Sequence, residues 1–308
     1  MSSYLSEKGQ KGEYHGKCKR DTEQNAEYQR YDENHQCHVH DIFIKMQKAK
    51  KSLADTEPFF FGQRNAVARF MQCVPDTKNI FFGKEGVAED QKKRGYIVIT
   101  ADKGLAGAYN HNVLKLASEE IEKHPQSELF VVGELGRQYF MKKNVYIDGE
   151  FSYTVQNPTL YRARHIGLQM IDKYVSGELD EVYIIYTKMI NAFKMEADMF
   201  QILPLHREEY LHKNLQGYND QMMFHPSVET LLDNLVPNVV CGFIYGALVE
   251  SYASEHNSRM MAMQTATDSA KKMLHDLEIE YNRVRQAAIT QEITEVIAGA
   301  KAQKSKKK

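Results

Sequence analysis

Two stretches of this sequence carry residue types that could do chemistry, and the first is a cluster of imidazole and thiol side chains. It contains His35, Cys37, His38 and His40. These residue types bind zinc, but their spacing is tighter than in the usual zinc arrangements and no second ligand pair follows. The sequence therefore predicts no metal site in this cluster.

The second stretch is the turn Asp102-Lys103-Gly104-Leu105-Ala106-Gly107. It follows an apolar run, at the place where nucleotide-binding α/β domains hold a phosphate group. It matches neither the dinucleotide fingerprint nor the phosphate-loop pattern, which needs Lys followed by Ser or Thr after a second Gly. Two glycines in such a turn most often serve the backbone conformation alone, so we predict no bound nucleotide or other cofactor.

No other pattern in the sequence indicates an active site. There is no serine nucleophile elbow, no paired carboxylate with a plausible partner and no histidine pair at metal-ligand spacing. Histidines beyond the cluster are scattered and are predicted to lie on the surface or in loops: His111, His124, His165, His206 and His212. We therefore expect a protein that is not itself an enzyme, with no catalytic, cofactor-binding or metal-binding residues.

The elements that would position the turn form an α/β pattern over residues 92–208. Apolar, β-branched runs predict strands at 96–100, 129–132, 181–187 and 200–205, and a further strand is expected at 145–151. Helices are predicted from residue 110, over 134–143 and over 158–176. Because strands separated by helices favour right-handed crossovers, we expect a mainly parallel sheet.

The carboxy-terminal stretch 247–298 contains neither Gly nor Pro and predicts a helix of roughly 75 Å at about 1.5 Å per residue. A core helix of a bundle is the alternative, and the length disfavours it. A short helix over 227–235 precedes it and is predicted to end before Pro237. Two heptad positions in the long helix indicate a coiled-coil seam: Met260, Thr267, Leu274, Tyr281 and Ala288 at one, and Met263, Ala270, Leu277, Val284 and Gln291 at the other.

The rest of the chain divides where the composition changes. Residues 1–44 are polar and show no apolar period, so they are predicted to be disordered. A helix is expected over 45–74, kinked or interrupted at Pro58, and the carboxy-terminal helical region is assigned to 227–300. The basic run 301–308 is predicted to be a solvated tail.

Composition limits the partners of the chain. Among 308 residues there are 40 Lys and Arg against 41 Asp and Glu, so no global charge draws the chain to nucleic acid or to a membrane surface. No apolar stretch is predicted to span a bilayer, and the amino terminus lacks a secretory signal pattern. The four cysteines have no paired spacing, which favours a reducing compartment and predicts no disulfide: Cys18, Cys37, Cys73 and Cys241.

Unusual residues concentrate in the long carboxy-terminal helix. Guanidinium, amide and carboxylate groups lie all round it, at Arg259, Arg283, Arg285, Gln286, Thr290, Gln291, Glu292, Thr294 and Glu295. Apolar residues such as Met260, Ile289, Ile293 and Val296 also occupy several sides. A helix that is both apolar and polar all round is expected when different partner surfaces enclose it.

These carboxy-terminal residues closely resemble the gamma subunits of F-type ATP synthases. The resemblance rests on segments 253–270 and 281–296 and on the strand and turn over 96–110, and it extends from about Lys45 to the end of the chain. It implies an α/β fold class, with a long antiparallel coiled coil of the first and last helices plus a Rossmann-like α/β domain at the foot.

By that resemblance the chain is the rotating central stalk of the proton-translocating enzyme, and it couples rotation of the membrane ring to ATP synthesis or hydrolysis. The expected partners are the alpha and beta subunits, which would surround the long carboxy-terminal helix (the rod), and the epsilon subunit and c-ring, which would bind the α/β domain at the foot. No nucleic acid is expected, and the membrane is reached only through the complex, on the cytoplasmic face of the bacterial cell membrane. The expected subunit-interface residues are Arg259, Met260, Arg285, Gln286, Thr290, Gln291, Glu292, Thr294 and Glu295.

Residues 1–44 depart from the family, which begins with a long basic helix. With permitted codons chosen from His15 to Lys45, a reading frame displaced by one base can encode a segment similar to that missing helix, beginning at its own Met. Loss of one adenine in the run encoding Lys45 and Met46 would rejoin the two frames. We hypothesise that residues 1–44 are out-of-frame translation, which would also account for the histidine and cysteine cluster.

The residues alone leave open an alternative function from another class of protein. The chain could be an α/β nucleotide-binding enzyme with a helical oligomerisation arm. Nucleotide binding by the isolated protein would favour that reading, whereas co-purification with alpha and beta subunits would favour the stalk.

Overall fold

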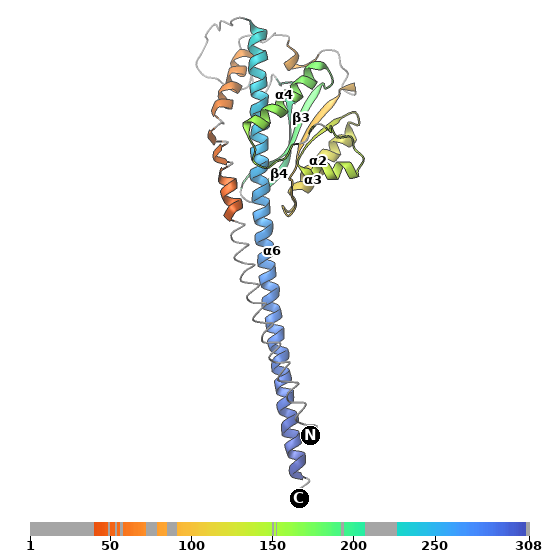
Figure 1. Cartoon of the computed structure of the whole chain (residues 1–308), viewed down its shortest axis with the longest axis vertical. Helices are drawn as coiled ribbons and strands as arrows, with labels where there is room; N and C mark the ends of the chain where they lie inside the picture. The colour runs from red at the N-terminus through yellow and green to blue at the C-terminus, as the bar shows by residue number, and fades with distance from the viewer. Residues whose placement is uncertain are drawn as a thin grey trace. The chain divides into compact units, whose positions relative to one another are not determined.

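The computed structural model describes residues 40–48, 50–52, 54–55, 58–71, 79–84, 91–149, 151, 153–191, 194–206 and 227–305 (Figure 1). The predictions for residues 1–39, for Cys73, for His212 and for the last residues 306–308 lie outside these ranges. Of the cysteines, Cys241 is described, and it is free and buried. His40 is described and exposed.

Four strands form one sheet in the described part of the chain. They are β1 (Arg94–Ile99), β2 (Glu128–Val132), β3 (Glu181–Met189) and β4 (Met195–Leu203), in the order β2-β1-β3-β4. β1 is parallel to both β2 and β3, which confirms the mainly parallel sheet. β4 is antiparallel to β3 and covers residues 195–203 rather than 200–205. The reason is that only the short segment 190–194 joins the two strands, too short for a parallel crossover.

Three helices accompany the strands much as the sequence predicts. They are α2 (Tyr109–Lys123), α3 (Glu134–Lys142) and α4 (Leu160–Ser176). Residues 145–151 do not form the expected strand and make only isolated bridges to β2, through Ile147 and, just beyond, Tyr153. The polar turn at Asp148, whose carbonyl accepts the amide of Phe151 at 3.3 Å, interrupts the ladder.

The sheet is the middle layer of an α/β/α arrangement (Figure 1). Alternate residues of β1 point to opposite faces, as strand geometry requires. Tyr96 and Val98 pack in a core cluster with α2 and α3, and Ile97 and Ile99 pack in a second cluster with α4 and α6 (Val228–Ser305). One face of the sheet is therefore covered by a helix that comes from the far end of the sequence.

Helix α6 runs without a break from Val228 to Ser305, through Pro237. The prediction of a separate helix over 227–235 is wrong. An interior proline costs roughly 3 kcal/mol of helix stability, because it lacks an N–H and crowds the preceding turn. Burial of Val236, Val239 and Val240 around it offsets this cost, at about 1.5–3 kcal/mol for each side chain. The Asn238 side-chain amide also donates to the carbonyl of Asn234 at 2.8 Å, which adds a bond across this turn of the helix.

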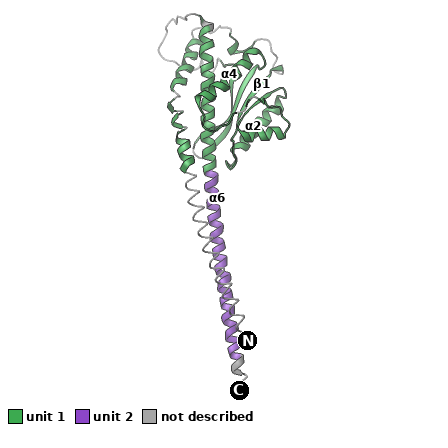
Figure 2. Ribbon diagram, viewed as in Figure 1, with its two compact units in different colours: residues 1–260 green, residues 261–308 purple. Residues whose placement is uncertain are grey.

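The chain divides into two compact units, residues 1–260 and residues 261–308 (Figure 2). In the first unit, amino-terminal helical residues pack against α6. Ser52 lies 2.8 Å from the Tyr245 hydroxyl, and further along the chain Phe60 lies against Gly242. Residue numbers increase along the amino-terminal helix in the direction in which they decrease along α6. The pairing is therefore antiparallel, as predicted.

The second unit consists of the remainder of α6 among the described residues. Between residues 263 and 274 the half-buried side chains are Met263, Thr267, Ala270 and Leu274, which all lie on the predicted seam. Every described side chain from His275 to Lys301 is exposed. The seam beyond Leu274 stays a prediction.

One described helix, α6, is long and apolar enough to cross a membrane, by length and composition only. This differs from the expectation that no stretch is long enough, because its most apolar window reaches a mean hydropathy of 1.4. Within the protein 61% of that window is buried, and a core helix gives the same signal. The burial favours a core role for this part of α6.

Candidate functional site

The carboxyl ends of β1 and β3 are where an open α/β sheet would bind a ligand. Leu105 and Gly107 in the turn after β1 have positive φ angles of 62° and 56°. Asn110 accepts the backbone amide of Ala101 at 2.8 Å, and Asp102 accepts that of Glu134 at 3.2 Å. These two bonds anchor the start of the turn to α2 and to the first residue of α3.

Helix α6 fills the space at the end of β3. Ser251 accepts the amide of Thr187 at 3.3 Å, and the Ser254 hydroxyl donates to the carbonyl of the same residue at 3.3 Å. Glu250 accepts the amide of Met189 at 3.1 Å. Both serines are fully buried. A helix of the same chain is therefore bonded directly to the end of β3.

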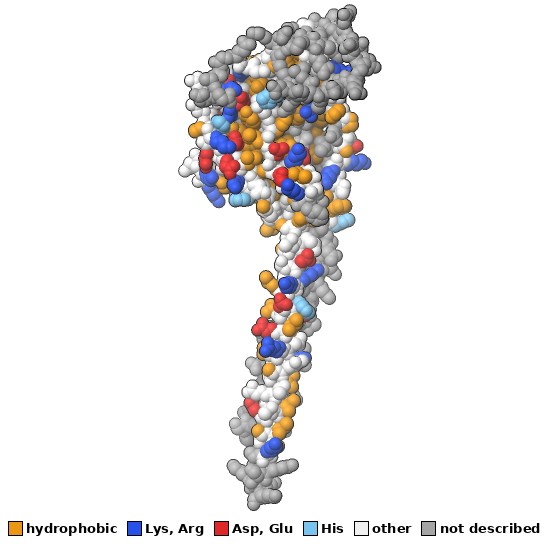
Figure 3. All heavy atoms as spheres, turned by 180° about the vertical axis from the view of Figure 1, so that it is seen from behind, with side chains coloured by type: hydrophobic (Ala, Val, Ile, Leu, Met, Phe, Trp, Pro, Cys, Tyr) orange, Lys and Arg blue, Asp and Glu red, His pale blue; other side chains and the backbone are white. Residues whose placement is uncertain are grey.

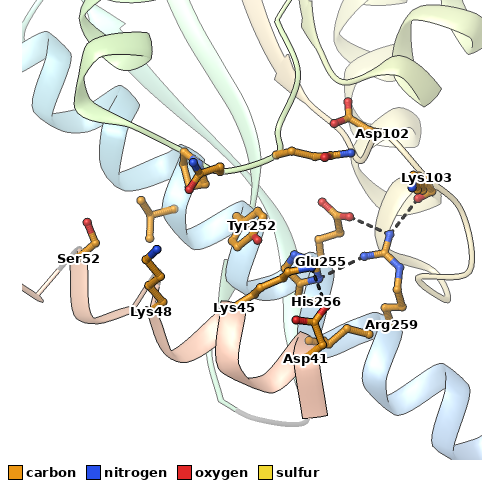
Figure 4. A pocket seen from close by; sticks show the side chains of 15 residues that line it. Asp41, Lys45, Lys48, Ser52, Asp102, Lys103, Tyr252, Glu255, His256 and Arg259 are labelled. Carbon is orange, nitrogen blue, oxygen red and sulfur yellow. Dashed lines mark hydrogen bonds and ion pairs between the residues drawn. The ribbon is translucent and has the colours of Figure 1, made fainter. Parts of the chain in front are cut away.

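Arg259 ties α6 to the turn after β1 (Figure 4). Its guanidinium donates to the carbonyl of Lys103 at 3.1 Å and to that of Gly104 at 3.3 Å. It also pairs with the Glu255 carboxylate at 2.7 Å and lies 3.3 Å from Nδ1 of His256. The planar fork of arginine suits this many acceptors at once.

Burial sets the electrostatics of the residues around Arg259. It raises the pKa of the Glu255 carboxyl, and the adjacent Arg259 guanidinium acts in the opposite direction. Burial, with Arg259 and Lys45 nearby, lowers the pKa of His256 to about 4. The His256 imidazole is therefore neutral at pH 7 and adds no positive charge beside Arg259.

A cavity of about 580 Å³ lies beside this cluster, among the amino-terminal helix, the turn after β1, the loop before α4 and α6 (Figure 4). Two of the acids that line it are engaged: Asp41 pairs with Lys45 at 2.7 Å and Glu255 pairs with Arg259. No group of three or more His, Cys, Asp or Glu suited to a metal occurs among the described residues. The arrangement can hold helix and turn together, and it presents no nucleophile with an adjacent base.

The structure places the predicted interface residues in two settings. Arg259 and Met260 are half-buried in the first unit. The others lie exposed in the second unit, where Thr290 and Thr294 donate to carbonyls one turn back and Gln291 donates to Glu295 at 3.1 Å. They are Arg285, Gln286, Thr290, Gln291, Glu292, Thr294 and Glu295.

Sequence reasoning missed Glu250, Ser251 and Ser254. Their signal was present, because they are polar residues that interrupt the apolar run of α6 at helical spacing. It could not identify their partners, because the groups they bond are backbone atoms of β3.

Comparison with known proteins gives a consistent family. A family model described as ATP synthase matches residues 43–303. The ATP synthase gamma chain of Ruminiclostridium cellulolyticum is 40% identical over 267 residues, which cover 84% of this chain and 89% of that protein. The gamma chain of Acetivibrio thermocellus is 40% identical over 266 residues, and the sodium ion specific gamma chain of Acetobacterium woodii is 36% identical over 273.

Solved structures share the fold. The central stalk and c-ring structure of the Tetrahymena thermophila mitochondrial ATP synthase matches with a TM-score of 0.56 at 22% identity, over 76% of this chain and 99% of that one. A chain of the Euglena gracilis mitochondrial ATP synthase matches with a TM-score of 0.53 at 16% identity, over 88% of this chain and 96% of that one. At these identities the likeness supports the fold alone.

Proposed function

We propose that this chain, which belongs to the ATP synthase gamma-chain family, works as the central-stalk rotor of the enzyme. It is a non-catalytic subunit, and the catalysis belongs to the beta subunits. The bonds of α6 to β3 and to the turn after β1 agree with a subunit in which the long helix and the α/β domain move together.

The observation that carries the proposal is the distribution of apolar side chains on α6 in the second unit. Leu277, Tyr281 and Val284 are all exposed and lie on the seam side of the helix. At about 100° per residue, Ile293 lies on roughly the opposite side and Ile289 on the flank next to it, and both are exposed as well. A coiled-coil partner covers one face only. The second apolar face therefore needs a different protein surface.

The polar residues between these faces are the proposed contacts with the alpha and beta subunits. Charged and apolar side chains are interspersed along the second unit (Figure 3). Arg285, with its planar fork, can bind a carboxylate of a neighbouring subunit, and Gln286 and Gln291 can donate directional hydrogen bonds. Arg259 and Met260 would contribute at the near end of the same helix. Thr290, Glu292, Thr294 and Glu295 complete the proposed interface.

We propose that the first unit binds the epsilon subunit and the c-ring. Large apolar side chains are exposed on its α/β domain, among them Met141, Tyr146 and Tyr161, with exposures of 63%, 72% and 75%. They lie on α3, after α3 and on α4, and they are the side chains that we expect these partners to cover. The complex is membrane-associated, and we place this chain on the cytoplasmic face of the bacterial membrane, in contact with the membrane only through its partners. Protons are the proposed coupling ion.

The mechanism follows from a rod whose sides differ. Each beta subunit would meet another face of α6, so the three catalytic sites are biased toward different conformations. As α6 rotates, each catalytic site would take up the three conformations in turn. Nucleotide binding energy at a catalytic site is then linked to torque on α6. The rod needs no reactive group for this purpose.

The test is assembly with the alpha and beta subunits of the same organism, followed by purification and an assay of ATP hydrolysis. The variant Ile293→Glu places a charge on the second apolar face, and Lys272→Ala, at an exposed site, is the matched control. We expect the control to match the unaltered chain in co-purification and hydrolysis, and Ile293→Glu to fall below both. Nucleotide binding by the isolated chain, without assembly, would contradict the proposal.

The amino-terminal segment has a separate test. The family match begins at residue 43, next to the Lys45 at which the displaced frame would rejoin. We propose that a chain whose first 44 residues are replaced by the displaced-frame sequence assembles better than the chain as written, because the last helix then has its partner. Equal assembly of both chains, or codons that do not permit the displaced reading, would contradict the frame hypothesis.

A further inference from the structure

Helix α6 contacts the two central parallel strands through two different kinds of contact. Along the sheet face the contacts are apolar, through residues such as Val240, Ile244 and Leu248. Where α6 passes the carboxyl ends of the strands, the contacts become hydrogen bonds to backbone atoms. The change occurs within about one turn of helix.

We propose that these hydrogen-bonding side chains form a clamp that transmits torque between α6 and the α/β domain. The clamp consists of Glu250, Ser251, Ser254 and Arg259. This inference rests on the proposed rotor function and assigns the place where the turning force passes from helix to sheet.

The chemistry of the clamp suits force in a fixed direction. Apolar burial stabilises an interface in proportion to area and has no preferred direction. Hydrogen bonds weaken steeply when donor and acceptor are misaligned. A helix that began to turn about its axis would break the bonds of Ser251 and Ser254 to Thr187 before it exposed much apolar surface. The bonds therefore fix the rotational position of α6 on β3.

Arg259 is the positioning residue of the clamp. Its side chain is only 13% exposed and that of Glu255 only 8%, so the ion pair between them is shielded from solvent. The remaining donors of the guanidinium reach the carbonyls of Lys103 and Gly104. Glu255 thus orients the guanidinium toward the turn, and breaking such a buried pair is costly. Arg259 thus joins α6 to the turn that follows β1, as the serines join it to β3.

The position of the clamp along α6 supports the same role. The boundary between the two compact units lies after Met260, and α6 continues through it. Arg259 comes one residue before Met260. Force that travels along α6 from the second unit therefore meets the hydrogen bonds of the clamp before it meets the apolar contacts at Val240 and Ile244.

A first measurement uses hydrogen exchange on the isolated full-length chain. The double variant Ser251→Ala with Ser254→Ala should speed exchange of the Thr187 amide about fivefold, the effect of losing one hydrogen bond. Arg259→Ala should speed exchange across residues 101–107 by a similar factor. Lys272→Ala is the control and should leave both regions unchanged. Unchanged exchange in the clamp variants would overturn the clamp as a contact.

A second measurement uses the assembled complex in vesicles and compares the membrane potential generated with the ATP hydrolysed. With the double variant Ser251→Ala and Ser254→Ala we expect hydrolysis to persist and the potential generated per ATP to fall by about threefold or more. The single variant Ser254→Ala should give a smaller loss, because the bond between Ser251 and the Thr187 amide remains. Lys272→Ala should match the unaltered chain.

The outcomes separate the clamp from the rotor role. A purely structural role for Ser251 and Ser254 would lower hydrolysis and pumping in proportion, and that result would overturn torque transmission through the clamp. If the unaltered chain failed to join the complex, the rotor proposal would fail, and the exchange measurement would still decide whether the clamp exists.

Discussion

The two parts of α6 show how one helix can serve two environments. In the first unit Ile244 and Leu248 are buried in the core of the α/β domain, with exposures of 0% and 1%. In the second unit Ile293 and Val296 are exposed by 55% and 73%. The residue types are similar, so apolar character alone does not separate the two regions. What differs is the cover: in the first unit the sheet and the amino-terminal helix both pack against α6, whereas these side chains of the second unit lie exposed.

The largest difference between the two regions is expected when one isoleucine in each is replaced by alanine. Ile244→Ala should lower the free energy of unfolding by about 2–5 kcal/mol, because it leaves a cavity in a packed core. Ile293→Ala should change it by less than about 0.5 kcal/mol. Urea unfolding of the isolated chain measures both. Equal losses would mean that the two regions share one kind of packing.

A pair of glycines within the first unit sharpens the comparison further. A Cβ on Gly242 would lie 2.5 Å from the Phe60 ring, whereas one on Gly246 would meet nothing within 4 Å. Gly242→Ala should therefore destabilise the protein by about 1–3 kcal/mol through overpacking. Gly246→Ala should stabilise it by about 0.5–1 kcal/mol, because alanine favours the helix. Thermal unfolding distinguishes them, and the same sign for both changes would contradict the close approach of the amino-terminal helix.

The buried part of α6 also predicts a pH dependence. Burial lowers the pKa of His256 to about 4, below the value of about 6.5 in an unfolded chain. The unfolded state then binds more protons between these values, so stability is present above pH 6.5 and is lost as the pH falls toward 4. We expect a loss of about 1–2 kcal/mol for this partly exposed side chain, after allowance for solvent screening.

Replacing the imidazole checks this assignment. His256→Gln should remove most of the decline between pH 6.5 and pH 4 in urea unfolding, while His275→Gln, in the exposed part of α6, is the control. A decline that persists in His256→Gln would assign it to other groups.

The smallest effect is expected on the exposed face of the second unit. Gln291 bonds to Glu295 on the helix surface, and such contacts contribute a few tenths of a kcal/mol. Gln291→Ala should therefore leave the stability of the isolated chain within about 0.5 kcal/mol and reduce ATP hydrolysis by the assembled complex. Normal hydrolysis by that complex would remove Gln291 from the proposed interface.

Much of the α/β domain could be predicted because its signals are local. Helix α4 begins where Thr159 accepts the amide of Arg162 and ends at Gly177, which has a φ of 85°. Pro237 misled the prediction because its local penalty is outweighed by burial that only the tertiary structure reveals. The antiparallel direction of β4 was also missed, because the sequence did not show that β4 begins at Met195, only a few residues after β3 ends.

The candidate site was less predictable than the fold. Arg259 could be selected by its residue type, but its partners are carbonyl groups of Lys103 and Gly104, which any residue could supply. Ser251 and Ser254 likewise bond the backbone of Thr187. Every residue type has the same backbone N–H and C=O groups, apart from the missing N–H of proline. The identity of the residue at the partner position therefore does not reveal these contacts.

The rotor role is tested most directly by watching single complexes turn. Alpha and beta subunits would be fixed to a surface, and a probe would be attached to this chain through Glu178→Cys, at an exposed site on the first unit. The account predicts rotation of the probe in one direction when ATP is added, at a rate that follows hydrolysis. Steady hydrolysis with a stationary probe would contradict it.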